Sequence, residues 1–294
     1  MTSTRLTLAP SERDTYGVIC KGATLTSLAN GFCFGEGPRW FEGLLWFSDM
    51  LGEAVHTVNL HGDMSKLPLT GHAPSGLGFR PDGSLLIAST ESRQVLRYDG
   101  ETVAPVADLS DIVPASLGDM GVDDLGRAYV GSQAREGGVI VRVDPDETVT
   151  VVAGDLDFPN GMVITPDGKT LMVAESVGRR LTAFAIGANG SLSERRIFAD
   201  GFDGPPDGIC LDTEGGVWVS MTLAHQFDRI VEGGTVTDRI NIGDRTAIAC
   251  TLGGPERRTL FMLSSTTAYP QRLVGTRLSR LDATIVDIPG AGLP

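Results

Sequence analysis

The segment 158–176, FPNGMVITPDGKTLMVAES, places two short apolar runs on either side of a tight turn. Asp167-Gly168 is typical of a β-hairpin turn, because glycine readily adopts the positive φ that such turns require. Asn160-Gly161 is a second pair of the same kind, eight residues earlier, where the first run begins. The segment predicts a hairpin, and it leaves open whether Asn160 belongs to a turn or is a functional group.

The same pattern occurs six times along the chain. Clear copies occupy residues 74–90, 117–132, 158–176 and 205–221, and weaker copies occupy 35–50 and 247–265. The turn glycines of the clear copies, Gly83, Gly126, Gly168 and Gly215, follow one another at intervals of 42 to 47 residues. The weaker copies have their turns at Gly43 and near Gly254.

Further strand candidates lie between the copies, so that each repeat supplies about four strands. Alternation of apolar residues, as in Leu85 and Ile87, favours strands throughout, and long helical patterns are nearly absent. The repeats predict an all-β fold, a six-bladed β-propeller. A β-sandwich with coincidentally regular spacing is the alternative.

We expect residues 1–294 to form a single propeller domain, with residues 1–21 as an N-terminal extension. Strand material at 22–32 and 276–290 lies outside the six repeats. A ring closed by strands from both termini would leave no sheet edge open.

Composition narrows the classes of partner. Lys and Arg number 24 against 37 Asp and Glu, a net charge of −13, which disfavours nucleic acid because phosphates attract basic surfaces. No apolar stretch is long enough to span a membrane, and the first residues do not resemble a secretory signal. We expect a cytoplasmic protein, a monomer or small homo-oligomer, whose four cysteines stay reduced.

One repeat position carries unusual residues. Eight residues before the turn glycine stand Ser75, Gly118, Asn160 and Asp207, and Glu36 is the counterpart in the first copy. These residues begin the innermost strand of each predicted blade, beside the central channel. Pro-Asp-Gly therefore has two meanings: at 81–83 and 166–168 it is the turn, whereas at 206–208 it starts a strand.

Glu36, Asn160 and Asp207 are expected to share one level beside the axis. Two carboxylates that face one channel repel each other unless a cation lies between them. A set of only oxygen donors suits a hard divalent cation. The register therefore predicts a cation held by these three residues, and the donor set suits Ca²⁺, Mg²⁺ or Mn²⁺ better than Zn²⁺. Ca²⁺ is expected in the first place, and Zn²⁺ stays possible.

The chain resembles the gluconolactonase, regucalcin (senescence marker protein) and luciferin-regenerating enzyme family. The resemblance rests on GEGPRW with LLWFSDM, on 158–176 and on PPDGICLDTEGGVWVS, and it extends from about residue 30 to VDIPGAG near the C-terminus. It implies a six-bladed propeller with one axial divalent metal, whose ligands match Glu36, Asn160 and Asp207. It also implies hydrolysis of lactones or related esters.

The third copy departs from the family pattern. Members that act on sugar lactones tend to carry Arg-x-Asn-Asp, where this chain has Ser116, Leu117, Gly118 and Asp119. The Asn that helps to hold substrate or metal in the family is thus replaced by Gly118, the Arg that contacts a polar sugar is replaced by Ser116, and Asp119 is retained. This departure predicts a less polar substrate than a sugar lactone.

The proposed chemistry gives Asp207 the role of general base or of nucleophile, and the sequence leaves both open. Asp119 is expected either to orient water or a substrate hydroxyl or to be structural. Substrate contacts are expected from ring positions and from loops at the channel mouth, namely from Ser75, Gly118, Gln133, Glu136, His72 and His225.

Three functions fit the sequence. The first is a metal-dependent hydrolase with a small-molecule lactone or ester as its substrate. The second is a metal-free enzyme similar to strictosidine synthase, which shares the architecture. The third is a propeller that only binds a partner, since this fold often serves as a scaffold.

Overall fold

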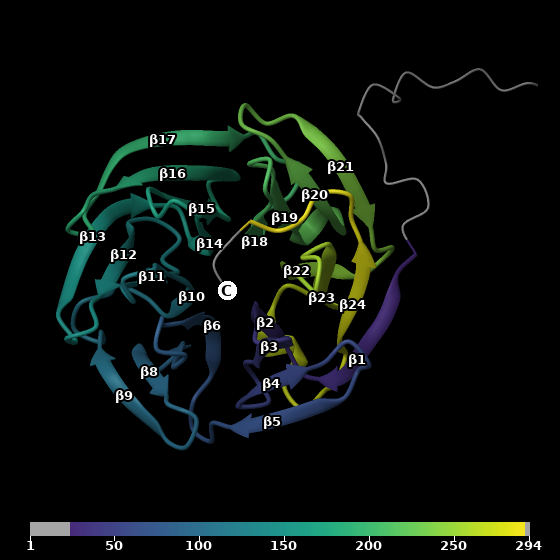
Figure 1. The fold of residues 1–294 in the computed structure, drawn as a ribbon, viewed down its shortest axis with the longest axis horizontal. Coiled ribbons are helices and arrows are strands. Elements are labelled where there is room, and N and C mark those ends of the chain that lie inside the picture. Colours follow the sequence, from purple (N-terminus) through teal and green to yellow (C-terminus); the bar gives the residue numbers. More distant parts are fainter. Residues whose placement is uncertain (1–23, 292–294) are drawn as a thin grey trace, which may run out of the picture.

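Six four-stranded antiparallel sheets stand in a ring around a central axis (Figure 1). The structure is a computed structural model that describes residues 24–291. It confirms the all-β, six-bladed β-propeller. Two short 3₁₀ turns, η1 (Thr222–Ala224) and η2 (Pro270–Leu273), are the helical elements of the described chain.

Each sheet is one blade, whose strands follow one another from the axis outward. Blade 1 has β2 (Gly35–Phe41), β3 (Leu44–Asp49), β4 (Ala54–Val58) and β5 (Met64–Pro68). Blade 2 has β6 (Pro74–Phe79), β7 (Leu85–Ser89), β8 (Gln94–Tyr98) and β9 (Val103–Asp108). Blade 3 has β10 (Leu117–Val122), β11 (Ala128–Ser132), β12 (Gly138–Val143) and β13 (Val149–Leu156).

The other three blades repeat the order. Blade 4 has β14 (Pro159–Ile164), β15 (Thr170–Glu175), β16 (Arg180–Ile186) and β17 (Leu192–Asp200). Blade 5 has β18 (Pro206–Leu211), β19 (Val217–Met221), β20 (Gln226–Ile230) and β21 (Val236–Asn241). Blade 6 has β22 (Thr246–Gly253), β23 (Thr259–Ser265), β24 (Ser279–Ile285) and β1 (Thr26–Phe32).

The predicted hairpin turns join the two inner strands of every blade. All six turn glycines have positive φ, between 67° and 84°: Gly43, Gly83, Gly126, Gly168, Gly215 and Gly254. A residue without a Cβ accepts this conformation at no steric cost. Asp82 and Asp167 act as turn residues, since the Oδ1 of each accepts hydrogen bonds within its own turn. The repeat register is therefore set by the backbone demand of one turn.

Blade 6 contains strands from both ends of the described chain. β1 pairs with β24, from Thr26 opposite Ala283 to Phe32 opposite Ser279. β24 in turn pairs with β23, so that β1 is the outermost strand of a sheet whose other strands are far away in sequence. The predicted extension, residues 1–21, lies outside the described residues.

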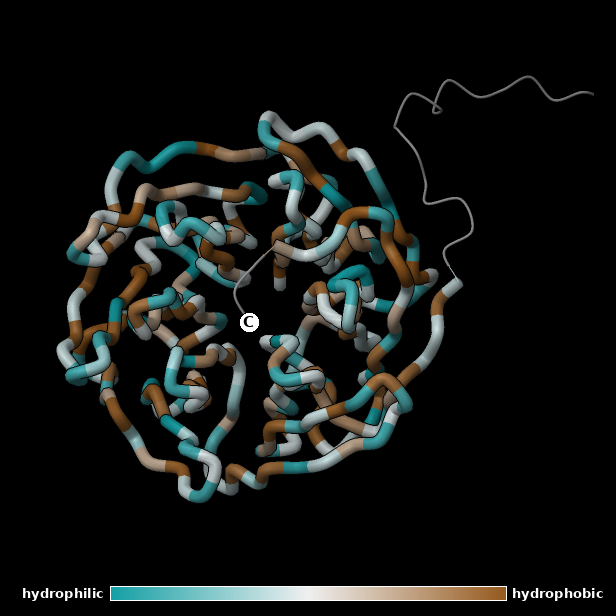
Figure 2. Tube along the Cα trace, viewed as in Figure 1, coloured by the Kyte–Doolittle hydropathy of each residue, from teal (hydrophilic) through white to brown (hydrophobic). Residues whose placement is uncertain are grey.

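The hydrophobic core is divided among the blade interfaces. Buried apolar side chains form six clusters, each shared by two neighbouring blades. The cluster between blades 2 and 3, for example, joins Leu86 and Val95 to Met120 and Val130. Figure 2 accordingly shows hydrophobic segments all around the ring. Sheet-on-sheet packing of this kind fixes each inner strand between two neighbours.

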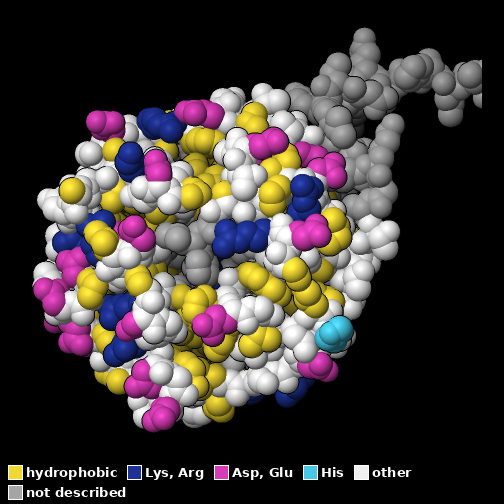
Figure 3. Space-filling view, viewed as in Figure 1, with side chains coloured by type: hydrophobic (Ala, Val, Ile, Leu, Met, Phe, Trp, Pro, Cys, Tyr) yellow, Lys and Arg dark blue, Asp and Glu magenta, His cyan; other side chains and the backbone are white. Residues whose placement is uncertain are grey.

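The surface shown in Figure 3 mixes acidic and basic side chains around the rim. Within residues 24–291, no helix is long and apolar enough to cross a membrane. Cys33, Cys210 and Cys250 are free thiols, and Cys20 lies outside the described residues.

Candidate functional site

The inner strands of all six blades carry a β-bulge near their first residues. In β2 the register shifts between Glu36 and Arg39, and equivalent shifts occur in β6, β10, β14, β18 and β22. A bulge interrupts the ladder locally and re-aims a side chain. The residues at this place, called the ring positions, are Glu36, Ser75, Gly118, Asn160, Asp207 and Ile248.

Glycines after the ring positions let neighbouring inner strands approach closely. A Cβ placed on Gly37 would lie 2.5 Å from the carbonyl oxygen of Ser75, and one on Gly161 would lie 2.4 Å from that of Asp207. A Cβ on Gly208 would lie 2.6 Å from the Cα of Ala249. Only a residue without a side chain fits at these three places. The close approach brings the ring positions to one level around the axis.

Glu36 and Asp207 are buried carboxylates that form no ion pair with any basic side chain in the described part of the chain. Their exposed fractions are 8% and 6%, and Asp207 Oδ1 has no hydrogen-bond partner among the described residues. Burial, followed by the charges of Asp207 and Asp119, raises the pKa of Glu36 well above its ordinary value. Burial and the charge of Asp119 likewise raise the pKa of Asp207. Among residues 24–291 no basic side chain forms an ion pair with either carboxyl group, and the raised pKa values mean that their charged forms are disfavoured unless a cation binds.

Asn160 is held by hydrogen bonds on both sides of its amide. Its Oδ1 accepts from Gln133 Nε2 at 3.2 Å, and its Nδ2 donates to Ser176 Oγ at 3.3 Å. Ser176 Oγ donates in turn to the carbonyl oxygen of Pro206, next to Asp207, at 2.6 Å. A carbonyl oxygen has two lone pairs, so Oδ1 keeps one for a further ligand.

Asp119 lies one residue beyond its ring position and is fully engaged by protein groups. Its Oδ1 accepts from Arg39 at 2.9 Å and from the backbone N–H of Met120 at 2.8 Å. Its Oδ2 accepts from the backbone N–H of Met162 at 3.2 Å. These bonds connect the inner strands of blades 1, 3 and 4 next to the ring positions. The geometry therefore favours the structural alternative for Asp119.

Of the other predicted substrate-contact residues, Ser75 and Gln133 lie at or next to ring positions, whereas the two histidines bond elsewhere. Ser75 is buried at its ring position, and its carbonyl oxygen accepts from Ser48 Oγ. Gln133 contacts Asn160 through the bond between their side-chain amides. His72 bonds to Ser89 Oγ at 3.0 Å, and His225 bonds to the carbonyl oxygen of Arg245 at 2.8 Å. His72 is thus bonded to the end of β7 within blade 2, and His225 of blade 5 is bonded to the segment that precedes β22 of blade 6.

Glu136 and Gly118 complete the predicted set. Glu136 is exposed in the loop after β11, and no described contact links it to a ring position. Gly118 occupies the third ring position and has no side chain to offer. The structure therefore associates Glu36, Ser75, Asn160, Asp207 and Gln133 through ring geometry or hydrogen bonds, and it gives Glu136 no such link.

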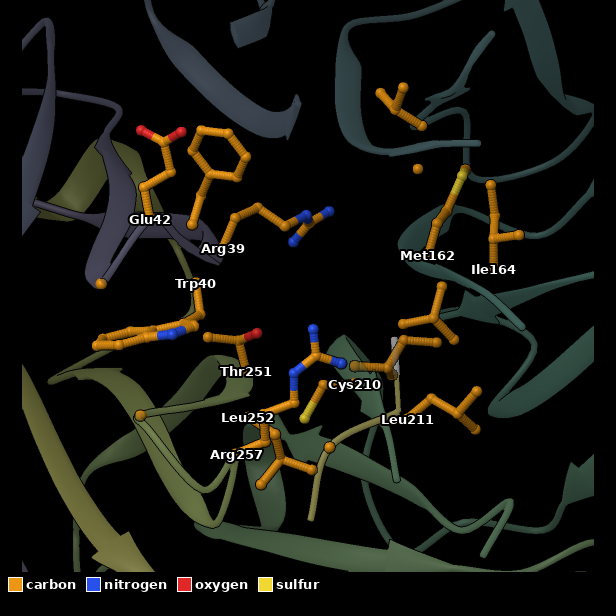
Figure 4. Close-up of a pocket in the computed structure, with 18 of the residues that line it drawn as sticks. Arg39, Trp40, Glu42, Met162, Ile164, Cys210, Leu211, Thr251, Leu252 and Arg257 are labelled. Carbon is orange, nitrogen blue, oxygen red and sulfur yellow. The ribbon is translucent and has the colours of Figure 1, made fainter. Parts of the chain in front are cut away.

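A cavity of about 610 Å³ lies toward the other end of the channel. Its lining includes hairpin turns at Gly43 and Gly254, which are the ends of inner strands opposite to the ring positions. Arg39 and Arg257 direct their guanidinium groups into this cavity, whose other walls are mostly apolar (Figure 4). Arg39 lines this cavity and also donates to Asp119, which follows the third ring position, so its side chain contacts both regions.

Three residues around the site, Arg39, Ser176 and Ile248, were not predicted from the sequence. Arg39 stands three residues after Glu36, and the residue three after a ring position lines the cavity in most blades, as Cys210 and Thr251 do. That regular spacing was a usable signal. Ser176 and Ile248 carried no such signal, because a serine after a strand and an apolar residue within one are common.

The donor chemistry of the ring fits a hard divalent cation. Two carboxylates and one amide oxygen are all oxygen ligands, and a cation would complete the partnerless Oδ1 of Asp207. Among residues 24–291, no group of three or more His, Cys, Asp or Glu side chains is placed to hold a metal ion. That criterion leaves out amide ligands such as Asn160, and Asp119 is already bound to Arg39. Glu36, Asn160 and Asp207 remain the candidate set.

Known proteins resemble this chain over most of its length. A 6-deoxy-6-sulfogluconolactonase from Pseudomonas putida is 28% identical over 273 residues, covering 88% of this chain and 94% of its own. A pentonolactonase from Haloferax volcanii is 26% identical over 252 residues, covering 82% of this chain and 85% of its own. A solved gluconolactonase structure from Xanthomonas campestris has a TM-score of 0.74 and 25% identity, covering 91% of this chain and 90% of its own.

The sequence model described as the SMP-30/Gluconolactonase/LRE-like region matches residues 34–266, which include all six ring positions. The match covers well over half of the chain and agrees with the propeller architecture. The chain therefore belongs to the SMP-30/gluconolactonase/LRE-like family.

Proposed function

We propose that this protein is a lactonase whose active site is the set of ring positions, with a divalent cation held by Glu36, Asn160 and Asp207. The observation that carries the proposal is the pair of buried carboxylates without a cationic partner. Leaving such charges uncompensated is costly, and a protein gains from it only if a ligand supplies the opposite charge. Relatives named as lactonases support the reaction class.

The residues have distinct tasks in this proposal. A cation bound there would supply Lewis-acid polarisation of the lactone carbonyl. Asp207, which would bind the cation through one carboxylate oxygen and keep the other, is the candidate general base toward water, or alternatively the nucleophile. Asn160 is fixed by Gln133 and Ser176, so that its oxygen keeps one direction. Burial of the set excludes bulk water and strengthens every electrostatic contact within it.

Asp119 and Arg39 are expected to stabilise the arrangement of the ring positions. Asp119 accepts from Arg39 and from the backbone of blade 4, and it adds negative charge near both ligand carboxylates. We expect it to strengthen cation binding without touching the substrate. Residues that support metal ligands in this way commonly change metal affinity by about 10- to 100-fold.

The test removes and restores the cation. Purified protein is analysed for metal content, treated with chelator, and assayed on sugar lactones, apolar lactones and aryl esters after addition of Ca²⁺, Mn²⁺, Mg²⁺ or Zn²⁺. Hydrolysis should vanish on chelation and return with at least one cation, and Glu36→Gln should reduce it strongly. Glu42→Gln, which changes a carboxylate lining the cavity at the other end of the channel, is the matched control and should keep activity.

Hydrolysis that survives chelation would refute the cation-dependent mechanism and favour a metal-free enzyme. Protein that binds no cation and hydrolyses none of the substrates would favour a binding scaffold.

A further inference from the structure

Gly118 leaves a gap in the ring, and the side chain of Gln133 occupies it. A Cβ built on Gly118 would lie 2.6 Å from Gln133 Nε2 and 2.8 Å from its Cδ. Gly118 does not have a positive φ, so its backbone imposes no need for glycine. The absence of a side chain at position 118 is therefore matched by the presence of the Gln133 amide.

The backbone around Gln133 holds the amide in this place. The backbone N–H of Gln133 donates to the carbonyl oxygen of Ser116, just before β10, at 2.9 Å. The carbonyl oxygen of Ala134 accepts from the backbone N–H of Phe158, before β14, at 2.9 Å. The segment is thus bonded to both blades whose ring positions are Gly118 and Asn160. The amide enters the ring from a loop instead of from the inner strand.

The orientation of the Gln133 amide leaves one oxygen available. Its Nε2 donates to Asn160 Oδ1 at 3.2 Å, and no described contact occupies its Oε1. An amide oxygen is an acceptable ligand for a hard divalent cation. Gln133 is half-buried, so this oxygen is not sealed within the core.

We infer that Gln133 is a fourth ligand of the axial cation, which supplies from the loop after β11 the oxygen that Gly118 lacks. The inference rests on the proposed function, because it assumes that a cation binds at Glu36, Asn160 and Asp207. It explains why a glycine at a ring position does not open the site.

Cation affinity is the first readout, measured by isothermal titration calorimetry with Ca²⁺ and with Mn²⁺ on chelator-treated protein. Gln133→Ala should weaken binding by about tenfold or more. Gly118→Asn added to Gln133→Ala should recover most of that loss, since it places an amide in the same gap from the inner strand. Gln94→Ala, which removes a half-buried amide in blade 2, is the control and should change nothing.

Gln133→Glu separates a ligand from a residue that only orients Asn160. Glutamate cannot donate to Asn160 Oδ1, so a purely orienting role predicts weaker binding. A ligand role predicts binding at least as tight as in the wild type, because a carboxylate is a stronger ligand than an amide. Thermal unfolding with and without cation checks that every variant is folded.

Wild-type affinity kept within twofold by Gln133→Ala would overturn the inference, as would weaker binding by Gln133→Glu. Either result would leave the proposed function intact, provided that the wild type binds. A wild type that binds neither cation would instead show that the proposed function has failed.

Discussion

Buried carboxylates occur in two settings in this molecule, on the axis and inside the blades. Glu36 and Asp207 on the axis are 8% and 6% exposed, while Glu175 and Asp212 in blades 4 and 5 are 0% and 1% exposed. Asp212 accepts from Arg229 Nε at 2.6 Å and from the N–H groups of its own turn. Degree of burial is similar in both settings, so the difference lies in the partners.

Glu175 shows what a partnered acid looks like. It accepts hydrogen bonds from Arg180, Arg195, Thr182 and the backbone N–H of Asp157. Burial alone would raise the pKa of Glu175, but the bonds from Arg180, Thr182 and Asp157 outweigh it, and the pKa is lowered. On the axis the pKa values of Glu36 and Asp207 shift in the opposite direction. Glu175 and Asp212 are thus paired with arginine side chains, whereas Glu36 and Asp207 form no ion pair with a basic side chain among the described residues.

The largest effect is expected from Asp207→Ala. Lactone hydrolysis should fall by about a thousandfold or more, because the variant loses both a ligand and the candidate base or nucleophile. Without cation, its melting temperature should be equal to or higher than that of the wild type, since an uncompensated buried charge is removed. Steady-state kinetics and thermal unfolding in chelator measure the two. A variant that is both active and less stable would place Asp207 among the structural acids.

A large loss of stability, without loss of cation affinity, is expected from Asp212→Ala. The change leaves Arg229 buried without its closest partner, and breaking such a pair costs about 3 kcal/mol of unfolding free energy. Urea denaturation in chelator gives the free energy, and calorimetry on the folded variant gives the affinity. An unchanged midpoint of unfolding would show that Asp212, despite its arginine partner, does not stabilise the fold more than the axial acids do.

Glu175 should produce an acid-dependent loss of stability. Because the pKa of Glu175 is lowered in the folded state, its contribution is present above its unfolded pKa and is lost as pH falls through the folded value. Glu175→Gln should therefore flatten this part of the pH dependence. Urea unfolding at a series of pH values from 7 downward, with wild type alongside, detects the change in slope. Identical slopes would contradict the assignment.

The smallest effect is expected from Asp82→Asn. Asp82 has the same Pro-Asp-Gly context as Asp207 but lies in a turn, with its side chain 54% exposed near Arg97. Exposed pairs contribute little, so unfolding free energy should change by less than about 1 kcal/mol. Cation affinity and hydrolysis should equal those of the wild type. A marked loss of either would mean that sequence context, instead of ring position, determines function.

The fold could be predicted because one local requirement repeats six times. Each hairpin needs a glycine at positive φ, and that requirement is written in the sequence at Gly83, Gly168 and their counterparts. The register of Glu36, Asn160 and Asp207 followed from the same repeat, and their role as ligands stays a prediction. Local sequence patterns were enough to predict these features because most blades are built from strands that are consecutive in the sequence.

The remaining features depend on contacts between blades. The bond from Arg39 to Asp119 joins residues 80 positions apart, and nothing in either strand alone specifies it. The entry of Gln133 into the space beside Gly118 requires knowing where a loop side chain ends. Position 248 in the weak sixth copy carries an isoleucine, which no chemical pattern would have marked as a ring position.

The bulge shared by the six inner strands makes the strand pairing of each blade independent of the residue at its ring position. The ladder resumes after each bulge whatever residue stands there, from glycine to glutamate. Ser75 is thus a place where a donor could be exchanged without altering the ladder, whereas Ile248 is also part of the hydrophobic cluster between blades 6 and 1. A fold organised in this way can change its reaction through single substitutions at the ring positions. This chain has one particular combination of residues at those six positions.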